Sequence, residues 1–99
     1  MIKSDQTYSI PDHVLIREID GEAIILDLEK GEYCGLNDVG HEFINGISKG
    51  TSFGAVVSEL SKIYDVSLDV LEADLSSLVD QLISSEIIRA DDALSLIHI

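Results

Sequence analysis

Basic side chains are scarce in this chain. Its 99 residues contain 6 Lys and Arg against 19 Asp and Glu, which gives a formal net charge of −13 at pH 7. Residues 1–36 and residues 37–99 are both acidic, so averaging over the chain hides no basic face. Nucleic acids bind to clustered Lys and Arg that displace counterions, and anionic membranes attract polybasic segments. We therefore expect neither a nucleic acid nor a membrane as a partner.

Residues suited to catalysis or metal binding are few and scattered. Cys34 is the only cysteine, which excludes an internal disulfide and a Cys-rich zinc site. The histidines, His13, His41 and His98, have no Cys or second His at ligand spacing. The glycines are spread singly, without a phosphate loop, and no Asp-x-Asp-x-Asp-Gly calcium loop is present. We expect a non-enzyme with no catalytic residue, metal or cofactor, in which Cys34 is a small buried or edge residue.

Long apolar runs and tryptophan are also missing. No run of about 18 apolar residues is present to span a bilayer, and residues 1–5 lack the apolar core of a signal peptide, so a cytoplasmic protein is expected. Hydrophobic residues make up 45% of the chain and charged residues 25%, the balance of one globular domain. With only 5% aromatics, its core must consist mainly of Ile, Leu and Val.

The two ends differ from the rest of the chain. Residues 1–12 are polar and show no period, which predicts a flexible N-terminal arm. Residues 91–99 are interpreted as a tail. Within it, residues 94–99 match one reading frame of an adapter that a common sequencing method joins to DNA fragments; the alternative is a native apolar tail. The functional argument leaves these residues out.

Three short segments in the first half of the chain have the composition of strands. They are His13–Ile19, Ala23–Leu28 and Glu32–Leu36, separated by Asp20-Gly21 and by Glu29-Lys30-Gly31. Because the links between consecutive segments are short, we expect hairpins and hence a three-stranded antiparallel sheet.

From Asn37 onward the apolar residues follow a helical period. Asn37 is a good N-cap for a helix that ends at residues 48–50, and Thr51 or Ser52 caps a second one that runs to about Tyr64. Ser67 caps a third helix that ends near Ser85, after which residues 87–89 form a tail or a short strand. The apolar stripe of the third helix is Leu71, Leu75, Leu78 and Leu82, widened by Leu68, Val79 and Ile83.

The order β-β-β-α-α-α predicts an α+β, winged-helix-like fold. In a DNA-binding version of this fold the last helix carries Arg and Lys into the major groove. Here residues 67–88 contain five acids and no base, so the third helix is unsuited to DNA. Another possible ligand is a peptide, because Glu32–Leu36 comes last in the sheet and an unpaired edge can accept a further strand. The alternative is that the third helix or a tail covers this edge.

Several motifs together resemble the PqqD-like family, the recognition domains for leader peptides of ribosomally synthesised, post-translationally modified peptides. Residues 26–40, LDLEKGEYCGLNDVG, are similar to the family's pattern of Leu-Asp, a turn and Gly-x-Tyr-x-x-Leu-Asn-x-x-Gly. Gly50-Thr51, Leu60 with Tyr64-Asp65-Val66, and the third-helix stretch Asp74–Leu82 follow in the family's order. The resemblance covers residues 13–90, which we take as the recognition domain.

The resemblance implies a non-catalytic module that binds a leader peptide as an added strand in a cleft between the third strand and the third helix. It is closest to the stand-alone proteins of lasso-peptide clusters, which present the precursor to a separate leader peptidase or other maturation enzyme. The residues implied to bind the leader are Glu32, Tyr33, Cys34, Gly35, Leu36, Asp74, Leu75, Leu78 and Gln81.

Some alternatives remain open. One alternative is that the chain is the N-terminal recognition domain of a larger modifying enzyme. Another is that it is a winged-helix interaction domain unrelated to peptide maturation. Many family members carry an aromatic residue, often Trp, in the first helix; this chain has Phe43 there but no Trp. Asp74 either points into the cleft and accepts a contact from the leader or belongs to a solvated helix face.

Overall fold

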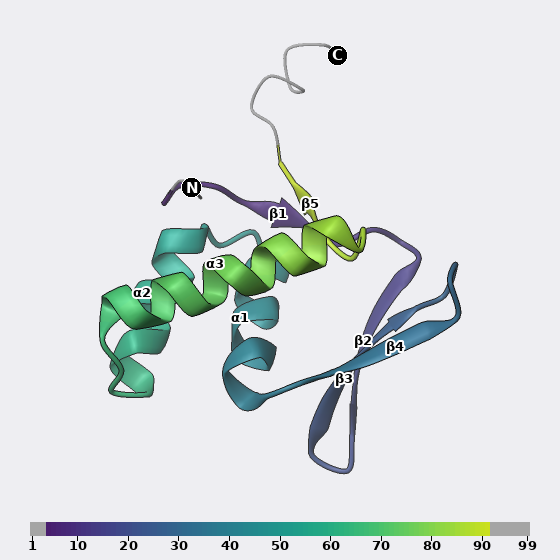
Figure 1. Cartoon of the computed structure of the whole chain (residues 1–99), viewed down its shortest axis with the longest axis horizontal. Coiled ribbons are helices and arrows are strands. Elements are labelled where there is room, and N and C mark those ends of the chain that lie inside the picture. Colours follow the sequence, from purple (N-terminus) through teal and green to yellow (C-terminus); the bar gives the residue numbers. More distant parts are fainter. Residues whose placement is uncertain (1–3, 92–99) are drawn as a thin grey trace.

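The computed structural model describes residues 4–91 and shows an antiparallel sheet beside three packed helices (Figure 1). The segment 94–99, interpreted above as an adapter sequence, lies outside the described residues. The elements, in chain order, are β1 (Tyr8–Ser9), β2 (Val14–Ile19), β3 (Glu22–Asp27), β4 (Glu32–Leu36), α1 (Asp38–Ser48), α2 (Phe53–Ile63), α3 (Leu68–Ser84) and β5 (Arg89–Ala90). Strands β2, β3 and β4 form the antiparallel sheet in that order, which confirms the predicted α+β fold.

The helices begin where the sequence predicts, but not every predicted N-cap residue makes a cap hydrogen bond. The Asn37 side chain accepts a hydrogen bond from the Gly40 N–H at 2.7 Å, and Ser52, rather than Thr51, caps α2 through the Ala55 N–H. Ser67 stands at the N-cap of α3 but makes no side-chain cap hydrogen bond. Within residues 4–91, no helix is long and apolar enough to cross a membrane.

The N-terminal segment is more ordered than its polar composition suggests. Strand β1 pairs with β5, Tyr8 opposite Ala90, and the Tyr8 side chain is only 4% exposed. The carbonyls of Ser4 and Gln6 accept hydrogen bonds from Gly54 and Phe53 at the start of α2, at 2.8 Å each. Residues 4–9 thus satisfy free N–H groups at the start of a helix and bury an aromatic ring, contacts that their polar composition did not predict.

The core lies between the inner face of the sheet and the three helices. It is mainly aliphatic, as expected, with one edge-to-face aromatic pair, Phe43 and Phe53, whose ring centroids are 5.8 Å apart. On α3 the predicted stripe is buried at Leu71, Leu75 and Leu82 and half-buried at Leu78, and Val79 widens it. Leu68 and Ile83 are exposed, so including them in the stripe was wrong.

Candidate peptide-binding groove

Strand β4 forms one edge of the sheet. It pairs with β3 along its whole length, from Asp27 opposite Glu32 to Ala23 opposite Leu36. Its other side has no strand partner among residues 4–91. The main-chain groups on such an edge are available to a further strand.

The register of this pairing determines which β4 side chains face the helices. Directly paired residues point to the same face of a sheet, and Cys34 and Leu36 lie opposite the buried Ile25 and Ala23. Cys34 and Leu36 therefore point to the helix side, as does Glu32. Tyr33, on the alternate face, is 76% exposed.

A groove of about 730 Å³ separates the sheet edge from α3. On the sheet side it is lined by Ile25, Asp27 and residues 30–36, and on the helix side by Leu78, Gln81, Leu82, Ser85 and Ile87. Seven of the nine residues expected to bind a leader line this groove. Cys34 lies on its wall as an exposed free thiol, which agrees with an edge position and not with a buried one.

The other two expected residues, Asp74 and Leu75, line a second hollow of about 360 Å³. This hollow shares Gly35, Leu36 and Leu78 with the first, so the two adjoin at the end of β4. Asp74 is exposed there, whereas Leu75 is 3% exposed and belongs mainly to the core. The structure thus brings all nine residues to one continuous surface, with Asp74 at its far end.

Gly40 lies where the two hollows meet. A Cβ atom at this position would stand 3.1 Å from the Asn37 side-chain oxygen, 3.4 Å from the Leu36 side chain and 3.7 Å from the Leu78 side chain. The bare backbone of Gly40 therefore lets the cap of α1 and the two apolar side chains pack closely at the junction.

The other end of the groove contains polar residues that the prediction missed. Asp27 is 4% exposed, and its carboxylate accepts hydrogen bonds from the backbone N–H groups of Glu29 at 3.0 Å and Lys30 at 3.1 Å. These contacts fix the β3–β4 turn, in which Gly31 adopts a φ of 68° that favours glycine. The Leu-Asp of the sequence motif was the available signal for Asp27.

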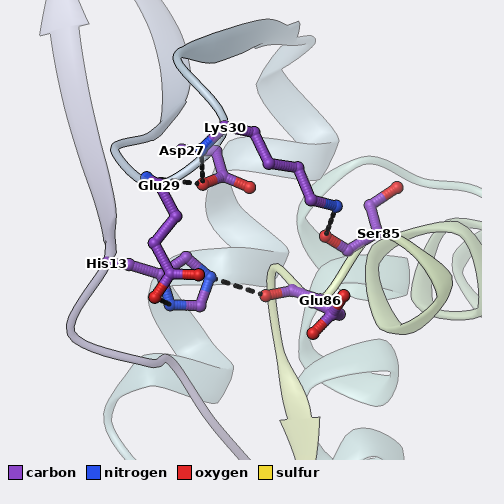
Figure 2. Close-up of polar contacts among 6 residues, drawn as sticks. All are labelled: His13, Asp27, Glu29, Lys30, Ser85 and Glu86. Carbon is purple, nitrogen blue, oxygen red and sulfur yellow. Dashed lines mark hydrogen bonds and ion pairs between the residues drawn. The ribbon is translucent and has the colours of Figure 1, made fainter.

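Two contacts connect this turn region to the end of α3 (Figure 2). The Lys30 ammonium donates to the Ser85 carbonyl at 3.2 Å, and His13 Nε2 lies 3.2 Å from the Glu86 carbonyl. The other ring nitrogen of His13 faces the Glu29 carboxylate at 3.7 Å. No sequence pattern indicated these contacts, because their partners are backbone carbonyls more than 50 residues away.

Comparisons with known proteins agree with this geometry. The family model of coenzyme PQQ synthesis protein D (PqqD) matches residues 22–88, which include both walls of the groove. The solved structure of TbiB1 in complex with the TbiA(beta) leader peptide is 28% identical, with a TM-score of 0.75 over 82% of this chain and 94% of that one.

A second similar structure is lasso peptide synthetase B1 complexed with the leader peptide. It is 24% identical, with a TM-score of 0.77 over 83% of this chain and 96% of that one, and it supports the fold. No curated protein sequence matches the chain significantly. Because the family model matches about two thirds of the chain, from the start of β3 to four residues past the end of α3, this protein belongs to the PqqD family.

Proposed function

We propose that this protein captures the leader peptide of a ribosomally synthesised precursor, of the lasso-peptide kind, and presents it to the enzymes that process it. The observation that carries the proposal is the edge of β4, which has no strand partner within residues 4–91 and faces α3 across a groove. The similarity to TbiB1, whose structure contains the TbiA(beta) leader peptide, indicates the class of peptide.

In this proposal the leader adds to the sheet as a strand beside β4. Its main chain exchanges hydrogen bonds with alternate residues of Glu32–Leu36, and every second side chain points into the groove. Leu36, Leu78 and Ile87 give that groove apolar surface on both walls. Apolar leader side chains are therefore expected at alternate positions.

The energetics predict moderate to tight binding. Each added main-chain hydrogen bond contributes about 0.5–1.5 kcal/mol, and each Å² of buried apolar surface about 25 cal/mol. Ordering of the peptide offsets much of this gain, so we expect dissociation constants between nanomolar and low micromolar. Since main-chain bonding is indifferent to sequence, selectivity has to come from the side chains on α3 and at the ends of the groove.

The charge of the protein favours a basic leader. Asp74 is exposed at the far end of the surface, and no base lies on α3. We propose that Asp74 accepts a hydrogen bond or an ion pair from a Lys or Arg of the leader. The negative field around the groove also accelerates the approach of basic peptides and repels acidic ones.

The protein itself is proposed to be a non-catalytic adaptor. Its partner would be a leader peptidase or another maturation enzyme that acts on the bound precursor. We propose a cytoplasmic location, since the precursor is made on ribosomes and must meet this protein before export.

Cys34 provides a direct test, because it is the only cysteine and lies on the groove wall. A panel of synthetic lasso-precursor leader peptides, including the TbiA(beta) leader, and their scrambled counterparts is titrated by fluorescence anisotropy. The rate of alkylation of Cys34 is then measured with and without each peptide.

The proposal expects at least one leader to bind in the micromolar range or tighter and to slow alkylation, while its scrambled counterpart does neither. It is contradicted if no leader binds, or if bound leaders leave the reactivity of Cys34 unchanged.

A further inference from the structure

The C-terminal end of α3 is closed by its own backbone and is also contacted from the sheet. The backbone N–H groups of Ser85, Glu86 and Ile87 donate to the carbonyls of Gln81, Ile83 and Leu82, and Glu86 adopts a φ of 62°. The carbonyls of Ser85 and Glu86, just beyond the helix, are contacted by the sheet side: Lys30 from the β3–β4 turn donates to Ser85, and His13, just before β2, contacts Glu86. We call Lys30 and His13, with these two carbonyls, the sheet–helix bridge (Figure 2).

Lys30 and His13 differ in their position relative to the groove. Lys30 and Ser85 both line it, so their contact crosses from one wall to the other. His13 does not line it and is largely buried, with a side chain 15% exposed. Since a carbonyl can only accept, Nε2 of His13 carries the proton in this contact.

The bridge holds the walls together at one end of the groove. At the other end, the side chains of Leu36 and Leu78 both lie close to Gly40, one from each wall. Between these ends an added strand must lie about 4.8 Å from β4 and also touch α3 with its side chains. A movement of α3 by about 1 Å weakens one of these contacts, since dispersion and hydrogen bonding both fall off within that distance.

We propose that Lys30 and His13 are positioning residues for leader binding: they hold the end of α3 at the distance from β4 that admits one peptide strand. This inference rests on the proposed function, because it names the residues that set the width of the same groove. Neither residue needs to touch the peptide to act in this way.

The test uses the fluorescein-labelled panel leader that binds most tightly and protects Cys34. Lys30→Met removes one contact of the bridge, and Lys30→Arg retains a donor of similar reach. Lys62→Met, in the last turn of α2, is the matched control, because it changes the net charge equally at an exposed lysine outside the groove. His13→Leu removes the second contact from outside the groove.

We expect Lys30→Met and His13→Leu each to weaken binding by about threefold to tenfold, chiefly through faster dissociation. Lys30→Arg should restore most of the affinity, and Lys62→Met should bind like the wild type. Hydrogen exchange should show faster opening of the amides of residues 85–87 in the two weakened variants, with thermal unfolding confirming that both remain folded.

Two results would overturn the inference while leaving the proposed function intact. In the first, both variants bind the labelled leader like the wild type. In the second, Lys30→Met weakens binding and His13→Leu does not, which would make Lys30 a direct peptide contact. Failure of every panel leader to bind the wild-type protein would instead contradict the proposed function itself.

Discussion

Leu78 is the position at which the binding groove can be tested most sharply. It is half-buried on α3 and lines both hollows, whereas its neighbours in the stripe, Leu75 and Leu82, are buried in the core. Replacing Leu78 by Asp therefore changes the surface that a leader would cover without opening a large cavity in the core.

The size of the effect follows from the exposed part of this side chain. Complete burial of a Leu is worth about 1.5–3 kcal/mol, and only the smaller part of the Leu78 side chain is left for a peptide to cover. The loss of that contact costs at most about 1 kcal/mol, and covering a carboxylate without a partner adds about 1–3 kcal/mol. Leu78→Asp should thus weaken binding by about 10-fold to several hundred-fold.

The matched control is Ile83→Asp on the same helix. Ile83 is 40% exposed and lines neither hollow, so the same change in charge and polarity should leave leader binding nearly unaltered. Both variants are compared by anisotropy with a labelled leader, after circular dichroism and thermal unfolding have shown that they fold. Equal affinities for folded Leu78→Asp and Ile83→Asp would refute the placement of the leader in this groove.

Four further predictions concern Asp74, Asp27, Tyr8 and the net negative charge of the protein. Asp74→Ala should weaken leader binding by about 1–3 kcal/mol and Asp69→Ala hardly at all, as measured by anisotropy at low and moderate salt; equal values at both salts would leave Asp74 no special role. Asp27→Ala should lower the free energy of unfolding by about 1–3 kcal/mol in urea titrations, because two backbone N–H groups of the turn lose their acceptor. Burial, and to a lesser extent the Asp80 carboxylate, raises the pKa of the Tyr8 hydroxyl above its usual value near 10. The unfolded chain then releases this proton first, so stability should fall as the pH rises above about 10, and Tyr8→Phe should reduce this loss in alkaline denaturation curves. Finally, the protein should not shift duplex DNA in gels at micromolar concentration, and a salt-sensitive shift would contradict the argument from its charge.

The local order of the chain was predictable because each element carries its own signal. The alternation and the turn residues placed β2, β3 and β4 within about one residue of their observed bounds. Asn37 marked the start of α1, and the spacing of Leu71, Leu75 and Leu82 identified the buried face of α3. These signals depend only on neighbours in sequence, so they needed no tertiary information.

The long-range contacts were not predictable in this way. Strand β1 consists of two residues, too few to show a period, and it forms only because β5 and the start of α2 lie beside it. The sheet–helix bridge ends on backbone carbonyls, which every residue has, so no pattern of residue types marks Ser85 or Glu86 as partners. The role of Asp74 was not predictable either, because an acidic residue on the exposed face of a helix has the same sequence pattern whether it borders a groove or faces solvent.

In this proposal the strand wall of the groove contributes mainly to affinity and the helix wall mainly to selectivity. Strand β4 offers main-chain groups and includes Gly35, which has no side chain, so it supplies affinity with little selectivity. Helix α3 offers Leu78, Gln81 and the nearby Asp74, which differ in polarity along its length and can select one leader from another. Substitutions on α3 should therefore change which peptides bind, while changes to the β4 backbone, such as a proline at Gly35, should weaken all of them.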